Sequence, residues 1–140
     1  MEPTAIPYPY LAMPSRTREF AWALADIDDR PDWPHRLHRH LTHLSDALTD
    51  HVRATEGERG CYAEVVDAAP HLAHGVRQLA RDHERLNGAL TALCERAGAG
   101  APPDDLRRRG ADLLVLLDEH RQRGIDLLYE AYGTDIGGET

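Results

Sequence analysis

The 140-residue chain contains no lysine, so its 16 basic residues are all arginine. They are outnumbered by 24 acidic residues, which gives a formal net charge of -8 at neutral pH. Nucleic acids and anionic membranes both require a basic face on the protein that binds them. The charge balance therefore argues against nucleic acid and membrane as partners.

Long apolar runs and cysteines are scarce as well. Apolar runs such as residues 113–117 are far shorter than the roughly 20 residues that a membrane-spanning helix needs. The two cysteines, Cys61 and Cys94, fit no spacing typical of zinc or redox sites. No signal peptide is recognisable, so we expect a cytoplasmic protein with reduced thiols. No glycine-rich phosphate loop or nucleophile motif is recognisable either.

Proline and glycine divide the chain into segments. Residues 1–14 are interrupted by proline and are expected to form an extended N-terminal arm. Ser15 resembles a helix N-cap, and residues 17–28 then read as a short helix. We expect residues 15–133 to form one helical domain, and the glycine-rich residues 134–140 to form a flexible acidic tail.

Leucines recur at helical spacing in three longer segments. The first follows the candidate cap Asp32 and extends beyond His51, and residues 61–68 are helical again after two glycines. The second runs from about residue 71 to 96, and the third runs from its cap, Asp104, to about residue 132. Since no segment has a strand pattern, we predict an all-α fold, an antiparallel up-down four-helix bundle.

Histidine replaces leucine once in each of these segments, at His51, His83 and His120. At a rise of about 1.5 Å per residue, His51 lies about 25 Å and His83 about 18–20 Å from the turn that joins their helices. From the other loop, His83 lies about 21 Å and His120 about 24 Å away. These depths agree within about one helical turn, whereas His40 and His43 miss them by more than about 10 Å. The three imidazoles are therefore expected to converge inside the bundle.

Converging imidazoles favour a metal ion. Three buried neutral rings need three hydrogen-bond partners, and three charged rings repel one another. A metal resolves both problems, because neutral imidazole is a good ligand for iron, zinc or manganese. A hydrogen-bonded polar layer without metal is the alternative.

Acidic residues precede each of these histidines, at Asp50, Asp82 and Glu119. They are candidates to orient an imidazole from a neighbouring helix. Neighbours in sequence do not share a helix face, so solvated surface acids are the simpler interpretation.

Tyrosines and glycines near the leucine positions also have two interpretations. Tyr62, Tyr129 and Tyr132 either line the core beside the histidines or only pack there. Gly110 and Gly124 either leave space for a small ligand or permit a close helix contact. Packing is the default interpretation for the tyrosines, and helix packing explains the two glycines as well as a ligand space does.

The segments LTDHVRATEG, LARDHERLNGAL and LLDEHRQRGIDLLYEAYGTDIGGE carry the three histidines. In this order, they resemble the hemerythrin-like, or HHE cation-binding, family over about residues 44–140. The resemblance implies an up-down four-helix bundle with a non-haem iron site, often di-iron, that handles or senses dioxygen, nitric oxide, peroxide or iron. It implies metal ligation by His51, Glu56, His83 and His120.

Carboxylates are displaced from the positions at which the family carries them. Four residues after His51 stands Thr55, with Glu56 one residue further on. After His120 the nearest carboxylate is Asp126, six residues on, where it points away from the leucine positions. A di-iron site needs bridging carboxylates, so this ligand set suits one metal with an open position better than two.

Three functions follow as hypotheses. The first is a hemerythrin-like metal protein, with iron as the expected metal and a small diatomic ligand or peroxide as the expected partner. The second is a bundle that has lost its metal and acts as an interaction or pH-responsive module. The third is an oxidative or hydrolytic metalloenzyme that uses the same histidines. The sequence identifies no protein partner.

Overall fold

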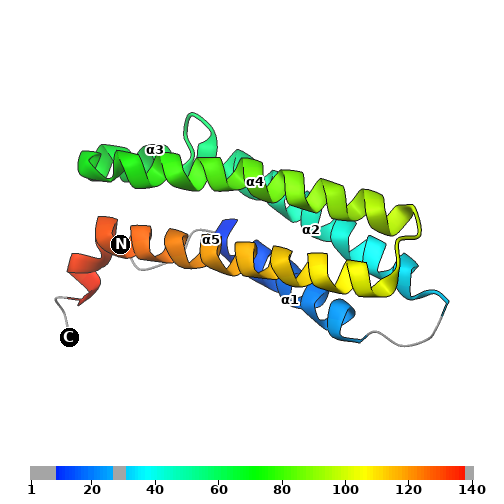
Figure 1. The fold of residues 1–140 in the computed structure, drawn as a ribbon. Coiled ribbons are helices and arrows are strands. Elements are labelled where there is room, and N and C mark those ends of the chain that lie inside the picture. Colours follow the sequence, from blue (N-terminus) through cyan, green and yellow to red (C-terminus); the bar gives the residue numbers. More distant parts are fainter. Residues whose placement is uncertain (1–8, 27–30, 138–140) are drawn as a thin grey trace.

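The computed structural model describes the backbone of residues 9–26 and 31–137, and the side chains of Met13, residues 15–26 and residues 31–132. The regular structure in this part of the chain is entirely helical, as predicted. Four long helices lie side by side (Figure 1): α1 (Pro9–Ala25), α2 (Trp33–Glu56), α4 (Ala73–Gly98) and α5 (Pro103–Gly137). The short helix α3 (Cys61–Ala68) and a 3₁₀ turn (Pro70–Leu72) connect α2 to α4.

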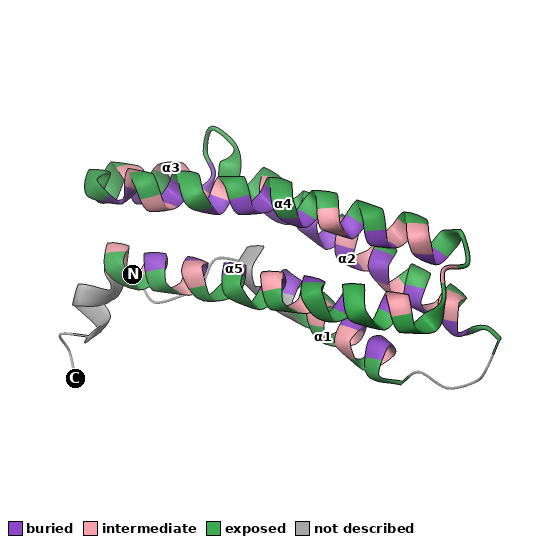
Figure 2. Ribbon diagram, viewed as in Figure 1, coloured by how far each residue is buried: buried purple, intermediate pink, exposed green. Residues whose placement is uncertain are grey.

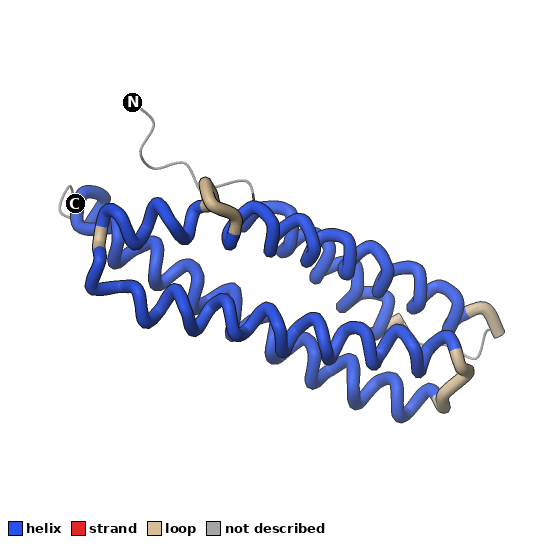
Figure 3. The backbone as a smooth tube through the Cα atoms, turned by 90° about the horizontal axis from the view of Figure 1, so that it is seen from above, coloured by secondary structure: helices blue, strands red, loops and turns tan. Residues whose placement is uncertain are grey.

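Each long helix packs against two others. α1 contacts α2 and α5, and α4 contacts α2 and α5, so the four helices enclose a common interior. Figure 2 shows the buried residues on the faces that the helices turn toward one another. Viewed from above, the connecting loops lie mainly at the ends of the helices (Figure 3). The described residues include no helix that is long and apolar enough to span a membrane.

Helices α2 and α4 form where the leucine period predicts them. Trp33 and Pro34 open α2, and proline at this point costs no hydrogen bond because the first helical N–H groups have no partner inside the helix. Asp32 occupies the cap position, although its carboxylate pairs with Arg36 at 3.3 Å and makes no capping hydrogen bond. The buried leucines of the two helices are Leu37, Leu41, Leu44, Leu48, Leu79, Leu86, Leu90 and Leu93.

The N-terminal segment differs from the prediction of an extended arm over residues 1–14. Helix α1 already begins at Pro9, so that prediction is wrong for residues 9–14, and residues 1–8 lie outside the described part. Pro14 stands inside α1 and removes one hydrogen bond. Burial of Met13, Phe20 and Leu24 offsets this loss, at roughly 1.5–3 kcal/mol for each large apolar side chain.

The limits of α1 also differ from the expected helix over residues 17–28. Ser15, expected as the N-cap, lies inside the helix. The helix ends at Ala25, and Asp26 is not helical. The expected last residues, 27 and 28, lie outside the described part.

Helix α5 is longer than predicted at both ends. It begins at Pro103, so Asp104 lies in its first turn, where a carboxylate interacts favourably with the helix dipole, and is not the cap. It continues to Gly137, so the prediction of a flexible tail is wrong for residues 134–137, while residues 138–140 lie outside the described part. Glycine lowers helix stability by about 1 kcal/mol per residue, which is too little to end a helix by itself.

The apolar interior consists of two clusters. The larger cluster takes residues from α1, α2, α4 and α5, and the smaller one takes Tyr62, Val65, Ala69, Leu72, Val76, Leu79 and Leu127. Along α4, the smaller cluster ends at Leu79 and the larger one begins at Leu86. On α4 and α5, the buried polar side chains of Asp82, His83 and His120 fall between the two clusters. On α2, the buried His51 and Thr55 follow Leu48, the last fully buried residue that this helix gives to the larger cluster.

Candidate metal centre

The three predicted histidines meet inside the bundle. His51 on α2, His83 on α4 and His120 on α5 are between 2% and 4% exposed. The Nε2 atom of His120 lies 3.1 Å from Nε2 of His83 and 3.3 Å from Nε2 of His51. The expectation that these imidazoles share one depth is therefore confirmed.

Two carboxylates occupy the outer nitrogens of this group. Nδ1 of His83 lies 2.5 Å from Oε2 of Glu56, and Nδ1 of His120 lies 3.1 Å from Oδ2 of Asp82. A carboxylate accepts a hydrogen bond from Nδ1–H, and a neutral ring that carries its proton on Nδ1 has none on Nε2. Glu56 and Asp82 therefore hold the two rings with their Nε2 lone pairs directed at the centre.

Burial keeps these two rings neutral. Burial and, to a smaller extent, the neighbouring His51 lower the pKa of His83 to about 4, against a smaller opposing effect of Asp82. Burial also lowers the pKa of His120, against the opposing effect of the hydrogen bond to Asp82. At neutral pH the Nε2 atoms of His83 and His120 therefore meet as two proton-free lone pairs, which repel one another.

Asp82 differs from the other two acids that precede a histidine. Its side chain is buried and also accepts a hydrogen bond from Nε of Arg123 at 3.0 Å. Burial raises the pKa of Asp82, but the hydrogen bonds from His120 and Arg123 outweigh this effect and lower it. Asp50 and Glu119 are exposed. The simpler interpretation as a surface acid is thus wrong for Asp82 and correct for the other two.

Neither Glu56 nor Asp126, the two carboxylates considered as ligands from the sequence, lies among the convergent histidine nitrogens. Glu56 lies on the outer side of His83, and the three convergent ligand atoms come from His51, His83 and His120 alone. Asp126 is exposed and accepts a hydrogen bond from Gln122 at 2.9 Å. No carboxylate among the described residues joins this convergent group.

Thr55 stands where the family carries a carboxylate four residues after a histidine. It is fully buried, and its hydroxyl donates to the backbone oxygen of His51 at 2.7 Å. The hydroxyl is therefore satisfied within its own helix.

Tyr62, for which packing was the default interpretation, is part of the site. Its hydroxyl oxygen lies 3.2 Å from Nε2 of His83, and its ring stacks on that imidazole with the centroids 5.7 Å apart. Tyr129, by contrast, is 58% exposed. The sequence signal for Tyr62 was its place after His51, at the start of the helical segment that follows Gly57 and Gly60.

Gly110 serves helix packing. A Cβ atom at this position would lie 2.7 Å from Cδ1 of Leu24, so the absent side chain allows α1 and α5 to approach closely. Of the two interpretations that the sequence allowed for this glycine, the close helix contact is the one observed.

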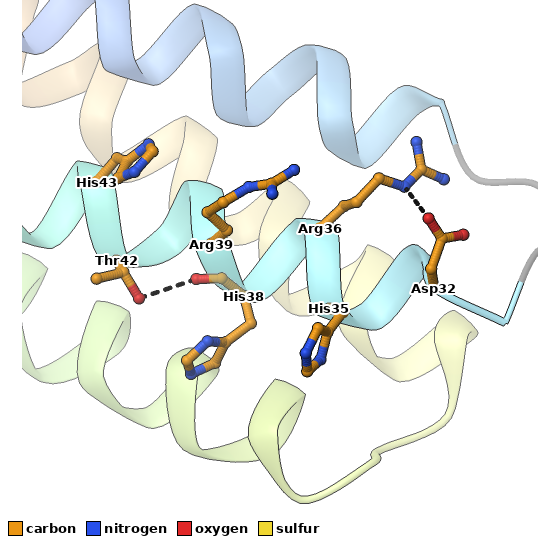
Figure 4. Close-up of a pocket in the computed structure, with 7 residues that line it drawn as sticks. All are labelled: Asp32, His35, Arg36, His38, Arg39, Thr42 and His43. Carbon is orange, nitrogen blue, oxygen red and sulfur yellow. Dashed lines mark hydrogen bonds and ion pairs between the residues drawn. The ribbon is translucent and has the colours of Figure 1, made fainter.

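The remaining histidines of α2 lie near its other end. Glu19, His40 and His43 bring three ligand atoms within 4.8 Å of one another, but none of these residues is buried. A neighbouring surface pocket is lined by Asp32, His35, Arg36, His38, Arg39, Thr42 and His43 (Figure 4). In Figure 4, His35 and His38 point away from Arg36 and Arg39, so these side chains do not converge on one point.

Comparison of the chain with models of known protein families, with curated proteins and with solved structures found no match. The resemblance to the hemerythrin-like family thus remains an expectation from the sequence, and the candidate centre is interpreted from its own geometry.

Proposed function

We propose that the protein is a hemerythrin-like, non-haem metal-binding protein in which Nε2 of His51, His83 and His120 hold one iron ion. The family resemblance supports iron, and the side-by-side packing of α1, α2, α4 and α5 supports an up-down antiparallel bundle. A bound iron ion would supply a site for a small diatomic molecule or peroxide.

The observation that carries this proposal is the 3.1 Å approach of Nε2 of His83 to Nε2 of His120, while Nδ1 of each ring faces a carboxylate. When the neutral rings donate Nδ1–H to Glu56 and Asp82, no proton is left between the two Nε2 atoms for a hydrogen bond. Two nitrogens about 2.1 Å from one ion lie about 3.0–3.4 Å apart at angles between square and tetrahedral. The distances from Nε2 of His120 to Nε2 of His83 and of His51 both fall within this range.

The acidic residues support one ion and not two. A second ion would need a bridging carboxylate, whereas Glu56 and Asp82 both face outer ring nitrogens. In this position, the two carboxylates orient the imidazoles and offset part of the cation's charge. Three protein ligands would leave more than one coordination position open, as in non-haem iron sites with three protein ligands, so the small molecule has a place to bind.

Metal analysis tests this proposal. Protein purified without a histidine tag and reconstituted anaerobically with ferrous iron should retain about one iron per chain, and His83→Ala should lose it. His43→Ala is the matched control, because it removes an imidazole from the unburied group of Glu19, His40 and His43 and should leave the iron content unchanged. If the wild-type protein retains no metal, the proposal fails and the metal-free interaction module becomes the better hypothesis.

A zinc hydrolase is the second candidate. It is favoured by a ligand group of three imidazoles with no carboxylate among the described residues, since zinc enzymes use three histidines and one open position. This candidate predicts that the purified protein contains zinc, and that hydrolysis of an ester is lost in His120→Ala.

A further inference from the structure

Tyr62 is placed against the centre by a tight connection between α2 and α3. A Cβ atom at Gly60 would collide with the backbone oxygen of Thr55, so only glycine lets α3 begin this close to the end of α2. Tyr62 follows two residues later, is 4% exposed, and lies with its ring nearly parallel to that of His83. Its hydroxyl oxygen is therefore held at the inner nitrogen of that histidine.

The hydroxyl of Tyr62 and a metal ion need the same lone pair. Nδ1 of His83 faces Glu56, so its Nε2 atom has one lone pair, to which the Tyr62 hydroxyl donates at 3.2 Å. An ion held by this Nε2 displaces the hydroxyl proton from it. The oxygen then lies at the spacing of about 3.0–3.4 Å that is expected for two ligand atoms of one ion.

Charge favours a phenolate ligand at this place. The three imidazoles are neutral ligands, and burying a cation without anionic partners is costly. The phenolate of Tyr62 and the carboxylates of Glu56 and Asp82 would supply three negative charges, of which the Arg123 guanidinium already offsets part at Asp82. The carboxylates act from behind the imidazoles, whereas the tyrosine oxygen faces the centre itself.

Resting on the proposed function, we propose that Tyr62 is a fourth protein ligand of this centre in its ferric form. On binding, the O–H bond of Tyr62 breaks, the proton leaves to solvent, and the phenolate oxygen donates an electron pair to iron. Iron stays ferric and the tyrosine is not oxidised, so the step needs neither an oxidant nor a reductant.

Visible absorption tests this ligand directly. Phenolate bound to ferric iron gives an intense charge-transfer band in the visible range, which imidazole and carboxylate ligands do not give. The experiment compares ferric-loaded wild type, Tyr62→Phe and Tyr132→Phe. Phenylalanine preserves the stacked ring in the first variant, and Tyr132 is a tyrosine of the smaller apolar cluster with no contact to the histidines among its described interactions.

We expect the band in the wild type and in Tyr132→Phe, and its loss in Tyr62→Phe with about a tenfold or greater fall in iron affinity. Stoichiometric iron without a band in the wild type, or tighter binding by Tyr62→Phe, would overturn this inference but leave the three-histidine centre intact. If no iron is retained, the centre and the tyrosine ligand both fail. Circular dichroism of each metal-free variant separates loss of the ligand from loss of the fold.

Discussion

Removal of the Asp82 carboxylate is the sharpest test of how the centre is organised. Asp82 is 6% exposed and accepts hydrogen bonds from Nδ1 of His120 at 3.1 Å and from Nε of Arg123 at 3.0 Å. In Asp82→Ala, the buried Nδ1–H of His120 loses its acceptor, which costs about 1–3 kcal/mol. The side chain of Arg123 is 40% exposed, so water replaces its lost partner and adds little to the cost.

We therefore expect Asp82→Ala to lower the free energy of unfolding of the metal-free protein by about 2 kcal/mol. Without Asp82, the proton of His120 is free to move to Nε2, and this removes the lone pair that faces the centre. Iron affinity should then fall about 10–100-fold, as is usual when the partner of a ligating histidine is removed.

Urea unfolding followed by circular dichroism measures the first effect, and competition with a chelator measures the second. Asp50→Ala and Glu119→Ala are matched controls, because each acid also precedes one of the three histidines but is exposed. Each should change the unfolding free energy by less than about 0.5 kcal/mol. If Asp82→Ala behaves like these controls in both assays, the assignment of Asp82 to the orientation of His120 is refuted.

Two other predictions concern pH and glycine. Burial holds the pKa of His83 near 4 and lowers that of His120. As the pH falls from 7 to 5, these histidines are therefore protonated in the unfolded chain before they are protonated in the folded one. The metal-free protein should lose stability over this range. Urea midpoints measured at both pH values check this, and an equal loss in His83→Gln would contradict it. Gly60→Ala should destabilise the fold by about 1–3 kcal/mol, because its Cβ meets the backbone of Thr55, whereas Gly88→Ala on the exposed face of α4 should stabilise it by about 0.5–1 kcal/mol. Thermal melts measure both variants, and the same sign of change in both would refute the steric argument.

Helical periodicity explains which parts of the fold were predictable. The leucines of α2 and α4 occupy one face at regular spacing, and both helices lie within a few residues of their predicted limits. Local rules failed where tertiary packing outweighs them. Pro14 and Gly133 predict breaks, yet the helices continue through them.

The site was predictable to the extent that it depends on helical rise. The common depth of His51, His83 and His120 follows from a fixed rise per residue, and it is confirmed. The position of a carboxylate relative to an imidazole depends on side-chain rotamers and on the rotation of neighbouring helices. For that reason, the sequence did not reveal that Asp82 would face His120, or that Tyr62 would reach His83.

The polar layer between the two apolar clusters has a consequence for local unfolding. The smaller cluster has no residue from α1 or α2, so it can open while the larger one stays packed. Amide hydrogens of residues 62–79 should then exchange with solvent sooner than those of residues 86–97. An ion bound by histidines of α2, α4 and α5 would couple the opening of the two clusters. Amide exchange in both clusters would then become slower and approach one common rate.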